Sequence, residues 1–184
     1  NVSIAYNDLS SDLERNNRIF IEGVLAMNPS KNFAPDANST IRMTYGNVKS
    51  YEPRDGVFYD YYTTLKGVME KENPDSYEFI VPEKLKQLYK DKNFGPYVNK
   101  NGDVPTCVIT NDDITGGNSG SPVINGNGEL IGCAFDGNWE SMSSDVMFEP
   151  DLQRCINVDI RYVLFIVDKF GGAGWLIEEM DIVK

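Results

Sequence analysis

The feature that most constrains the fold of this chain is a hairpin signal near its centre. Two apolar runs, at residues 121–124 and 129–135, are separated by Asn-Gly-Asn-Gly at residues 125–128. Glycine and asparagine tolerate the left-handed backbone conformations of tight hairpin turns, so the two runs are predicted to be antiparallel strands. A parallel sheet would need a longer crossover between them.

Other short segments extend this pattern. Residues 41–45 alternate between apolar and polar side chains, residues 57–62 are rich in aromatic side chains, and residues 106–110 form an apolar run. Each is typical of a short strand bounded by turn residues.

Helices are predicted around these strands. Residues 8–27 place apolar side chains on one face at helical spacing, and residues 83–90 follow a proline that suits a first helical turn. Residues 159–170 are predicted to be helical up to the glycine pair that follows, and a last helix is expected over residues 173–180. The predicted fold is mainly β, a small antiparallel barrel or sandwich with flanking α-helices.

Composition restricts the chemistry. The 184 residues contain no histidine, and 28 Asp and Glu oppose 17 Lys and Arg, for a net charge of −11. Without imidazole, the chain by itself can form neither a Ser-His-Asp nor a Cys-His catalytic centre, and neither a Cys₂His₂ zinc site nor a histidine-ligated haem site. The acidity argues against nucleic acid or an anionic membrane as partner. No apolar run approaches the ~20 residues of a membrane span.

Three cysteines, Cys107, Cys133 and Cys155, lack the spacing of a metal knuckle. They are predicted either to be buried small side chains or to form one disulfide with a spare thiol.

A glycine-rich segment before the hairpin carries the strongest chemical signal. Gly-Asn-Ser-Gly-Ser-Pro at residues 117–122 lacks the lysine of a phosphate-binding loop, and a strand follows it where a hydrolase nucleophile elbow would lead into a helix. It is similar to the nucleophile loop Gly-Asp-Ser-Gly-Gly-Pro of chymotrypsin-like serine peptidases. In such a loop, glycines let successive backbone amides point at one spot.

The resemblance becomes narrower over several separate motifs. The segments concerned are residues 35–40, 51–56, 69–74, 110–122, 134–140 and 154–165. Together they resemble the C-terminal portion of the bacterial dipeptidyl-peptidase 7/11 family of chymotrypsin-like serine exopeptidases, from about residue 19 to the end. The resemblance implies a chymotrypsin-like C-terminal β-barrel over residues 39–184. Residues 1–38 would be a helical segment that leads from a helical cap lying outside this sequence.

The same resemblance assigns roles to individual residues. Ser119 would be the nucleophile, and the backbone N–H groups of Gly117 and Ser119 would form the oxyanion hole. Phe135, Asp136 and Gly137 would bind substrate, with Asp136 holding the terminal ammonium. Glycine at 137 implies hydrophobic penultimate residues, because the branch that cleaves after acidic residues carries arginine there.

The rest of the reaction would need sequence outside this chain, including the catalytic histidine and aspartate. The fragment alone is therefore expected to be inactive. The resemblance further implies peptide substrates with a free N-terminus, a homodimer, a periplasmic or cell-surface location, and no cofactor.

Two alternatives to an active peptidase stay open at this point. If the glycine loop is only a turn, the chain is a non-catalytic peptide-binding or structural module; the other alternative is an inactive peptidase homologue. Asp136, Asn138 and Glu140 loosely resemble a calcium loop but lack its remaining ligands, so no metal is expected. Asp112 and Asp113 are interpreted as turn and strand-end residues.

Overall fold

The chain divides into two compact units, Asn1–Arg42 and Met43–Lys184, which are described separately. The computed structural model describes residues 2–31, 33, 39–144 and 147–183. In the first unit, helix α1 spans Val2–Met27, so the helix predicted over residues 8–27 is confirmed and begins six residues earlier. Its apolar positions Leu9, Leu13 and Phe20 are 65–71% exposed.

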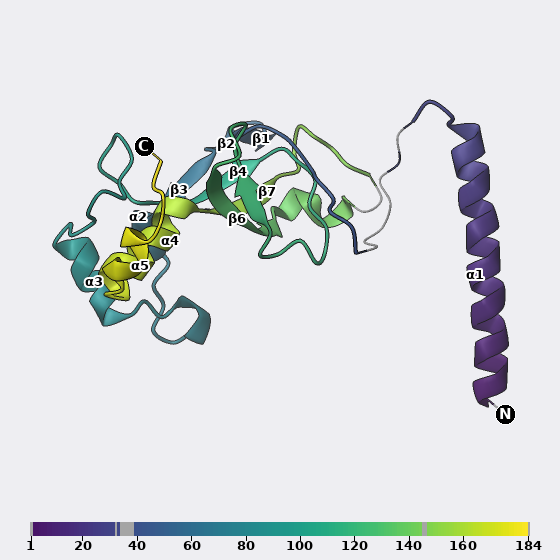
Figure 1. The fold of residues 1–184 in the computed structure, drawn as a ribbon, viewed down its shortest axis with the longest axis horizontal. Coiled ribbons are helices and arrows are strands. Elements are labelled where there is room, and N and C mark those ends of the chain that lie inside the picture. The colour runs from purple at the N-terminus through teal and green to yellow at the C-terminus, as the bar shows by residue number, and fades with distance from the viewer. Residues whose placement is uncertain (1, 32, 34–38, 145–146, 184) are drawn as a thin grey trace. The chain divides into compact units, whose positions relative to one another are not determined.

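A five-stranded antiparallel sheet forms the centre of the second unit (Figure 1). Its strands lie in the order β3 (Tyr62–Thr64), β4 (Pro105–Thr110), β7 (Cys155–Asp159), β6 (Leu130–Gly137) and β5 (Pro122–Ile124). The predicted hairpin is confirmed as β5 and β6, and the backbone of Asn125 exchanges hydrogen bonds with Glu129 and Gly128 in the turn. A separate two-stranded hairpin joins β1 (Tyr51–Arg54) to β2 (Val57–Tyr59).

The central strand β7 is not among the strands predicted above. It pairs with β4 on one side and with β6 on the other, so it connects the hairpin to the rest of the sheet. Its five residues alternate between fully and partly buried side chains, a pattern that needs both neighbours to form.

The predicted mainly β barrel with flanking helices is confirmed only in part. The chain combines a sheet with helices in a mixed α/β architecture. The sheet is not closed, because the edge strands β3 and β5 do not pair with each other within the described residues. Closure into a barrel requires every edge to find a partner, and both edge strands have only three residues. The strand predicted over residues 41–45 is wrong: Ile41, Met43 and Tyr45 are 80–100% exposed and pair with no strand.

Helices pack at one end of the sheet. They are α2 (Leu65–Glu70), the 3₁₀ turn η1 (Tyr77–Phe79), α3 (Glu83–Lys90), α4 (Ile160–Phe165), the π-helical turn η3 (Ile166–Phe170) and α5 (Gly174–Glu178). The helix predicted over residues 159–170 thus consists of the α-helix α4 and the π-helical turn η3. The helix changes from α to π because the N–H of Gly171 donates to the carbonyl of Ile166, five residues back, at 2.7 Å.

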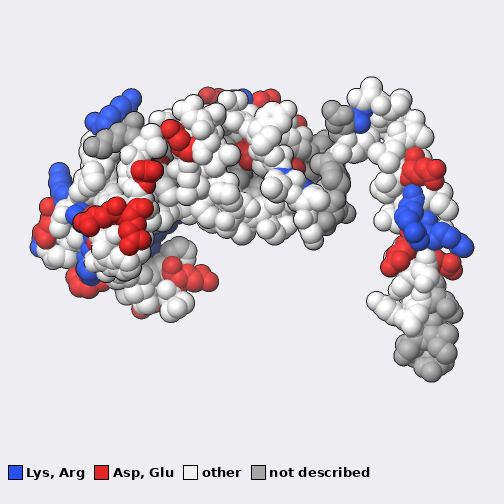
Figure 2. Space-filling model, viewed as in Figure 1, with Lys and Arg blue, Asp and Glu red and all other residues white. Residues whose placement is uncertain are grey.

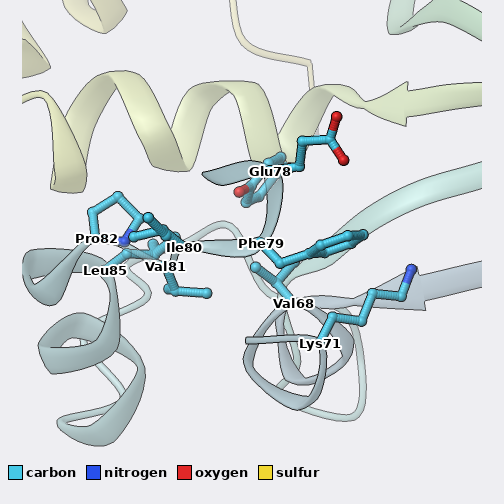
Figure 3. A pocket seen from close by; sticks show the side chains of 9 residues that line it. Val68, Lys71, Glu78, Phe79, Ile80, Val81, Pro82 and Leu85 are labelled. Carbon is cyan, nitrogen blue, oxygen red and sulfur yellow. The ribbon is translucent and has the colours of Figure 1, made fainter. Parts of the chain in front are cut away.

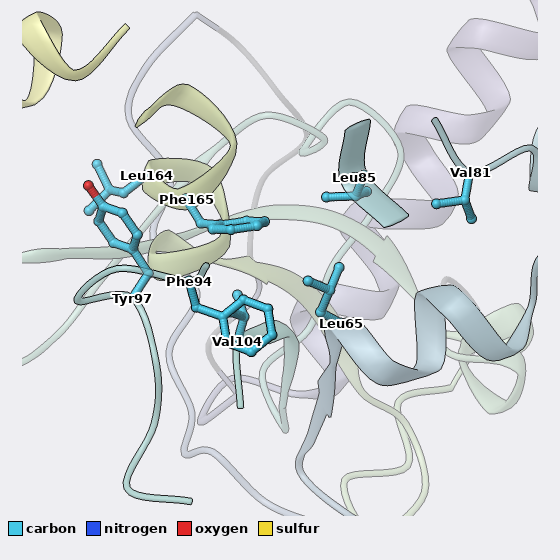
Figure 4. Packing of buried hydrophobic residues seen from close by; sticks show 8 residues of the cluster. All are labelled: Leu65, Val81, Leu85, Phe94, Tyr97, Val104, Leu164 and Phe165. Carbon is cyan, nitrogen blue, oxygen red and sulfur yellow. The ribbon is translucent and has the colours of Figure 1, made fainter. Parts of the chain in front are cut away.

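The main cluster of buried hydrophobic residues lies among these helices and the loops that join them (Figure 4). Phe165 and Leu65 are at most 1% exposed, and the ring of Phe94 meets that of Phe165 edge-on at 6.2 Å. The hydroxyl of Tyr97 donates to Asp168 at 2.9 Å, and burial together with this carboxylate raises the pKa of Tyr97 to about 12. Burial of these aromatic and aliphatic side chains is the main source of stability at this end.

Charged side chains gather around the helices, whereas the surface over the sheet is mostly uncharged in the view of Figure 2. No helix in the described parts of the chain is long and apolar enough to cross a membrane.

All three cysteines are free thiols. Cys107 and Cys133 both lie opposite Val158, one on each side of β7, so two strand spacings of about 10 Å separate them and they cannot form a disulfide. Cys155 is 2% exposed, and burial, aided by the Asp112 carboxylate, raises its pKa to about 12.

We therefore expect unequal thiol reactivity at pH 8. Cys155 should react with a disulfide reagent at least about tenfold more slowly than the half-buried Cys133, because only the thiolate attacks and the Cys155 thiolate is disfavoured. Mass spectrometry of the labelled protein measures each rate, and unfolding in urea should equalise them. Equal rates in the folded protein would contradict this picture of Cys155.

Candidate active site

The glycine-rich segment forms a tight loop between β4 and β5. Gly117 and Gly120 have φ of 93° and 90°, in the left-handed region that strains side chains with a Cβ. A Cβ at either position would meet no heavy atom within 4 Å, so the requirement for glycine is conformational and not steric. The two glycines flank Ser119, which lies exposed on the turn.

Asn118 holds the loop closed from within. Its side-chain oxygen accepts hydrogen bonds from the backbone N–H of Thr115 at 2.9 Å and from the Thr115 hydroxyl at 3.2 Å. Its own N–H donates back to the carbonyl of Thr115 at 3.1 Å. Both side-chain hydrogen bonds use the amide oxygen as acceptor, a role that an aspartate oxygen could also fill.

The loop is fastened to strand β6. The N–H of Gly120 donates to the carbonyl of Ala134 at 2.8 Å, and the N–H of Ala134 donates to the carbonyl of Ser121 at 2.9 Å. These bonds continue the β5–β6 ladder past the end of β5. They place Ser119 next to Phe135.

Strand β6 bulges at Phe135. Ala134 lies opposite Asn157, whereas Asp136 lies opposite Ile156, so Phe135 is an extra residue in the ladder. A bulge bends the strand and redirects its polar groups. The Phe135 carbonyl accepts a hydrogen bond from the Ser119 hydroxyl, at 3.1 Å.

Several backbone donors on the loop have no acceptor in the described part of the chain. They include the N–H groups of Gly117 and Ser119, the pair expected to form an oxyanion hole. Both residues are exposed, so these donors are open to a bound molecule.

Asp136 and Gly137 follow the bulge. The Asp136 carboxylate accepts a hydrogen bond from the N–H of Gly137 at 2.8 Å through Oδ1, and its side chain is exposed. The structure therefore brings together, on one loop and one bulged strand, all of the residues proposed from the sequence: Gly117, Ser119, Phe135, Asp136 and Gly137.

A buried polar network behind this strand was not predicted from the sequence. Asn138 donates to Glu140 at 2.9 Å and to the carbonyl of Leu152 at 2.8 Å, and the Tyr51 hydroxyl donates to the same Glu140 oxygen at 2.9 Å. These hydrogen bonds fix the side chains of Asn138 and Glu140 within the fold. No group of three or more acidic, cysteine or histidine residues is placed to hold a metal in the described ranges of the chain.

The guanidinium of Arg154 anchors this network. The side chain is 1% exposed and donates to five backbone carbonyls at 2.7–3.1 Å, those of Lys49, Ser50, Pro150, Asp151 and Gln153. It also lies over the ring of Tyr51, 5.2 Å from the centroid, and burial lowers its pKa. No local sequence signal marks a buried arginine of this kind, because two of its five acceptors, the carbonyls of Lys49 and Ser50, lie more than 100 residues away in the sequence.

Asp112 and Asp113 lie on the same loop, next to the segment around Gly46. The amide nitrogen of Asp112 would be 2.6 Å from a Cβ on Gly46, so glycine is required there by close approach of the two backbones. The side chain of Asn111 accepts a hydrogen bond from the N–H of Asn47 at 2.7 Å in the same contact. This supports the interpretation of the segment as a structural turn.

Two surface cavities are lined by residues other than those of the glycine-rich loop, and neither lining includes a serine or a cysteine. The first, of about 290 Å³, is mainly apolar, with Lys71 and Glu78 as its charged lining residues (Figure 3). The second, of about 360 Å³, lies beside Tyr61, Asp159 and Arg161. Neither contains a residue of the glycine loop, so the loop is the better candidate for chemistry.

The comparison with known protein families decides the assignment. The peptidase S46 family model matches residues 2–182, which is nearly the whole chain. This chain belongs to the peptidase S46 family.

Individual members of the S46 family agree with this. The chain is 66% identical over 167 residues to dipeptidyl-peptidase 7 of Phocaeicola vulgatus, covering 91% of this chain and 23% of that protein. It is 51% identical over 181 residues to the Asp/Glu-specific dipeptidyl-peptidase of Porphyromonas gingivalis, covering 97% of this chain and 25% of that protein. This S46 chain therefore spans about a quarter of the length of these relatives.

A solved structure shows the same fold. The crystal structure of Porphyromonas endodontalis DPP11 in complex with substrate matches this S46 chain with a TM-score of 0.81 and 51% identity, covering 87% of this chain and 23% of that one. The resemblance identified from the sequence motifs is thereby confirmed.

Proposed function

We propose that this chain is the C-terminal part of a serine dipeptidyl-peptidase, in which Ser119 attacks the second peptide bond from a free N-terminus. The observation that carries the proposal is the exposed Ser119 hydroxyl on a turn with two flanking left-handed glycines, next to two unused backbone N–H donors. A nucleophile beside donors for a developing oxyanion is the arrangement needed for acyl transfer.

The steps follow from these groups. The Ser119 oxygen forms a bond to the scissile carbonyl carbon, and a histidine outside this chain takes the hydroxyl proton and then protonates the leaving amine. The N–H groups of Gly117 and Ser119 stabilise the oxyanion, and water then hydrolyses the acyl-enzyme. No cofactor takes part.

Substrate would lie along the bulged strand. The Phe135 carbonyl, which accepts the Ser119 hydroxyl at 3.1 Å, is an acceptor within reach of a substrate N–H placed over the nucleophile. The exposed Asp136 carboxylate would hold the substrate's terminal ammonium. Gly137 adds neither a side chain nor a charge beside the strand, which supports a preference for hydrophobic penultimate residues.

Two further proposals rest on the resemblance alone. The whole enzyme would act on peptides in the periplasm or at the cell surface, and it would do so as a homodimer.

The test compares the 184-residue chain with the full-length protein that contains it. Full-length protein should release fluorophore from a dipeptidyl-coumarylamide and should fail with the Nα-acetylated substrate, because the ammonium is lost. The 184-residue chain should release none, because it lacks histidine. Turnover by the chain alone, or equal cleavage of the acetylated substrate by the full-length protein, would contradict the proposal.

A further inference from the structure

A side chain added at Gly137 would extend towards Ser141. A Cβ at position 137 would lie 3.0 Å from the Cβ of Ser141, 3.4 Å from its hydroxyl and 3.7 Å from a methyl group of Ile114. The first of these distances is shorter than ordinary carbon–carbon contact. Any side chain at 137 therefore meets Ser141, on the 3₁₀ turn η2 (Trp139–Ser143), before anything else.

Ser141 is not free to move aside. Its hydroxyl donates to the side-chain oxygen of Asn138 at 2.6 Å and accepts from the N–H of Arg154 at 3.2 Å. Its own N–H donates to the carbonyl of Asn138 at 3.0 Å. With the hydroxyl engaged by these partners, the group that faces Gly137 most closely is the methylene carbon.

The partners of Ser141 are themselves fixed. The side-chain oxygen of Asn138 accepts from the N–H of Arg154 at 2.8 Å, and the N–H of Asn138 donates to the carbonyl of Arg154 at 2.9 Å. The Arg154 side chain is in turn buried and bonded to five carbonyls, as described above. A side chain at position 137 would therefore press against Ser141, which its hydrogen bonds to Asn138 and Arg154 hold in place.

We infer that Ser141 is a second specificity-determining residue, which bounds the space beside Gly137 and presents an apolar wall to the substrate's penultimate side chain. This inference rests on the proposed function and names the residues behind its specificity. Positions 137 and 141 then act as a pair: a side chain at 137 requires a smaller residue at 141.

A double-mutant cycle in the full-length protein tests the pairing. The variants are Gly137→Ala, Ser141→Gly and their combination, assayed by kcat/KM on dipeptidyl substrates with alanine, leucine or phenylalanine in the penultimate position. Gly137→Ala should lower kcat/KM for the leucine and phenylalanine substrates by about tenfold or more, and for the alanine substrate by less. Adding Ser141→Gly should recover most of that loss.

Two matched variants control the interpretation. Ser141→Ala removes the same hydroxyl but keeps the Cβ, so it should not rescue Gly137→Ala. Ser143→Gly loosens the same turn at a residue that does not contact position 137, and it should not rescue either. Rescue by either control, or additive effects of Gly137→Ala and Ser141→Gly, would overturn the inference.

The thermal unfolding midpoints of the same variants separate this inference from the proposed function. Gly137→Ala should lower the midpoint, and Ser141→Gly should lower it less in the Gly137→Ala background than in the wild type. A wild-type protein without dipeptide release overturns the proposed function. Normal wild-type release with uncoupled midpoints and additive kinetics overturns only the role of Ser141.

Discussion

Replacing Ser119 with alanine in the full-length protein should lower kcat for dipeptide release by about 10⁴-fold or more. The reason is that the loop would keep its backbone donors but lose the atom that forms the acyl-enzyme. Folding should be unaffected, because Ser119 is exposed and its hydroxyl makes one hydrogen bond, to the Phe135 carbonyl. A stopped assay with a dipeptidyl-coumarylamide, together with a thermal melt, measures both.

Ser121→Ala is the matched control for this result. Ser121 lies two residues further along the same loop, and the bonds that fasten it are made by its backbone. Its substitution should leave kcat within about threefold of the wild type, since surface changes of this kind have small effects. Activity above a tenth of wild type in Ser119→Ala, or an equal loss in Ser121→Ala, would remove Ser119 from the role of nucleophile.

Replacing Arg154 with methionine should destabilise the second unit by about 3 kcal/mol or more. Methionine fills similar volume but donates to none of the five carbonyls that the guanidinium satisfies, so all five hydrogen bonds are lost. For a unit of this size, the loss should appear as a fall of about 6–12 °C in the thermal midpoint. Circular dichroism of the 184-residue chain measures it.

Two comparisons sharpen this second prediction. Arg154→Lys keeps the charge but offers three donors from one point in place of five in a planar fork, so it should recover less than half of the lost stability. Arg54→Met, on the exposed side of β1, should leave the midpoint within about 1 °C. A midpoint for Arg154→Met that matches Arg54→Met would show that the carbonyl contacts contribute nothing to stability.

Local patterns predicted the elements whose stability depends on neighbours in sequence. The β5–β6 hairpin depends on a turn of asparagine and glycine, and α3 on helical spacing behind a proline, and both are confirmed. The loop around Ser119 also carries its own signal, because the two left-handed backbone positions require glycine. The split of the C-terminal helix at Ile166 had no such signal, since it depends on how the chain leaves the helix.

Elements that depend on distant partners could not be predicted in this way. Strand β7 is specified by β4 and β6 on either side, and neither neighbour is adjacent to it in the sequence. The burial of Arg154 depends on carbonyls as far away as Lys49. Residues 41–45 show that a local pattern alone is not sufficient. Their side chains alternate between apolar and polar, but the segment forms no strand because it has no partner strand.

The sequence by itself determined the glycine-rich loop around Ser119, the hairpin that follows it and the lack of histidine in this chain. These features follow from residue type and from neighbouring residues, because backbone sterics and side-chain chemistry act locally. The tertiary structure alone decided that Phe135 bulges towards Ser119, that Arg154 ties down the segment behind it, and that Ser141 faces Gly137. Each of those contacts joins groups that only the completed sheet brings together, because register and close approach between strands are set by pairing and not by local preference.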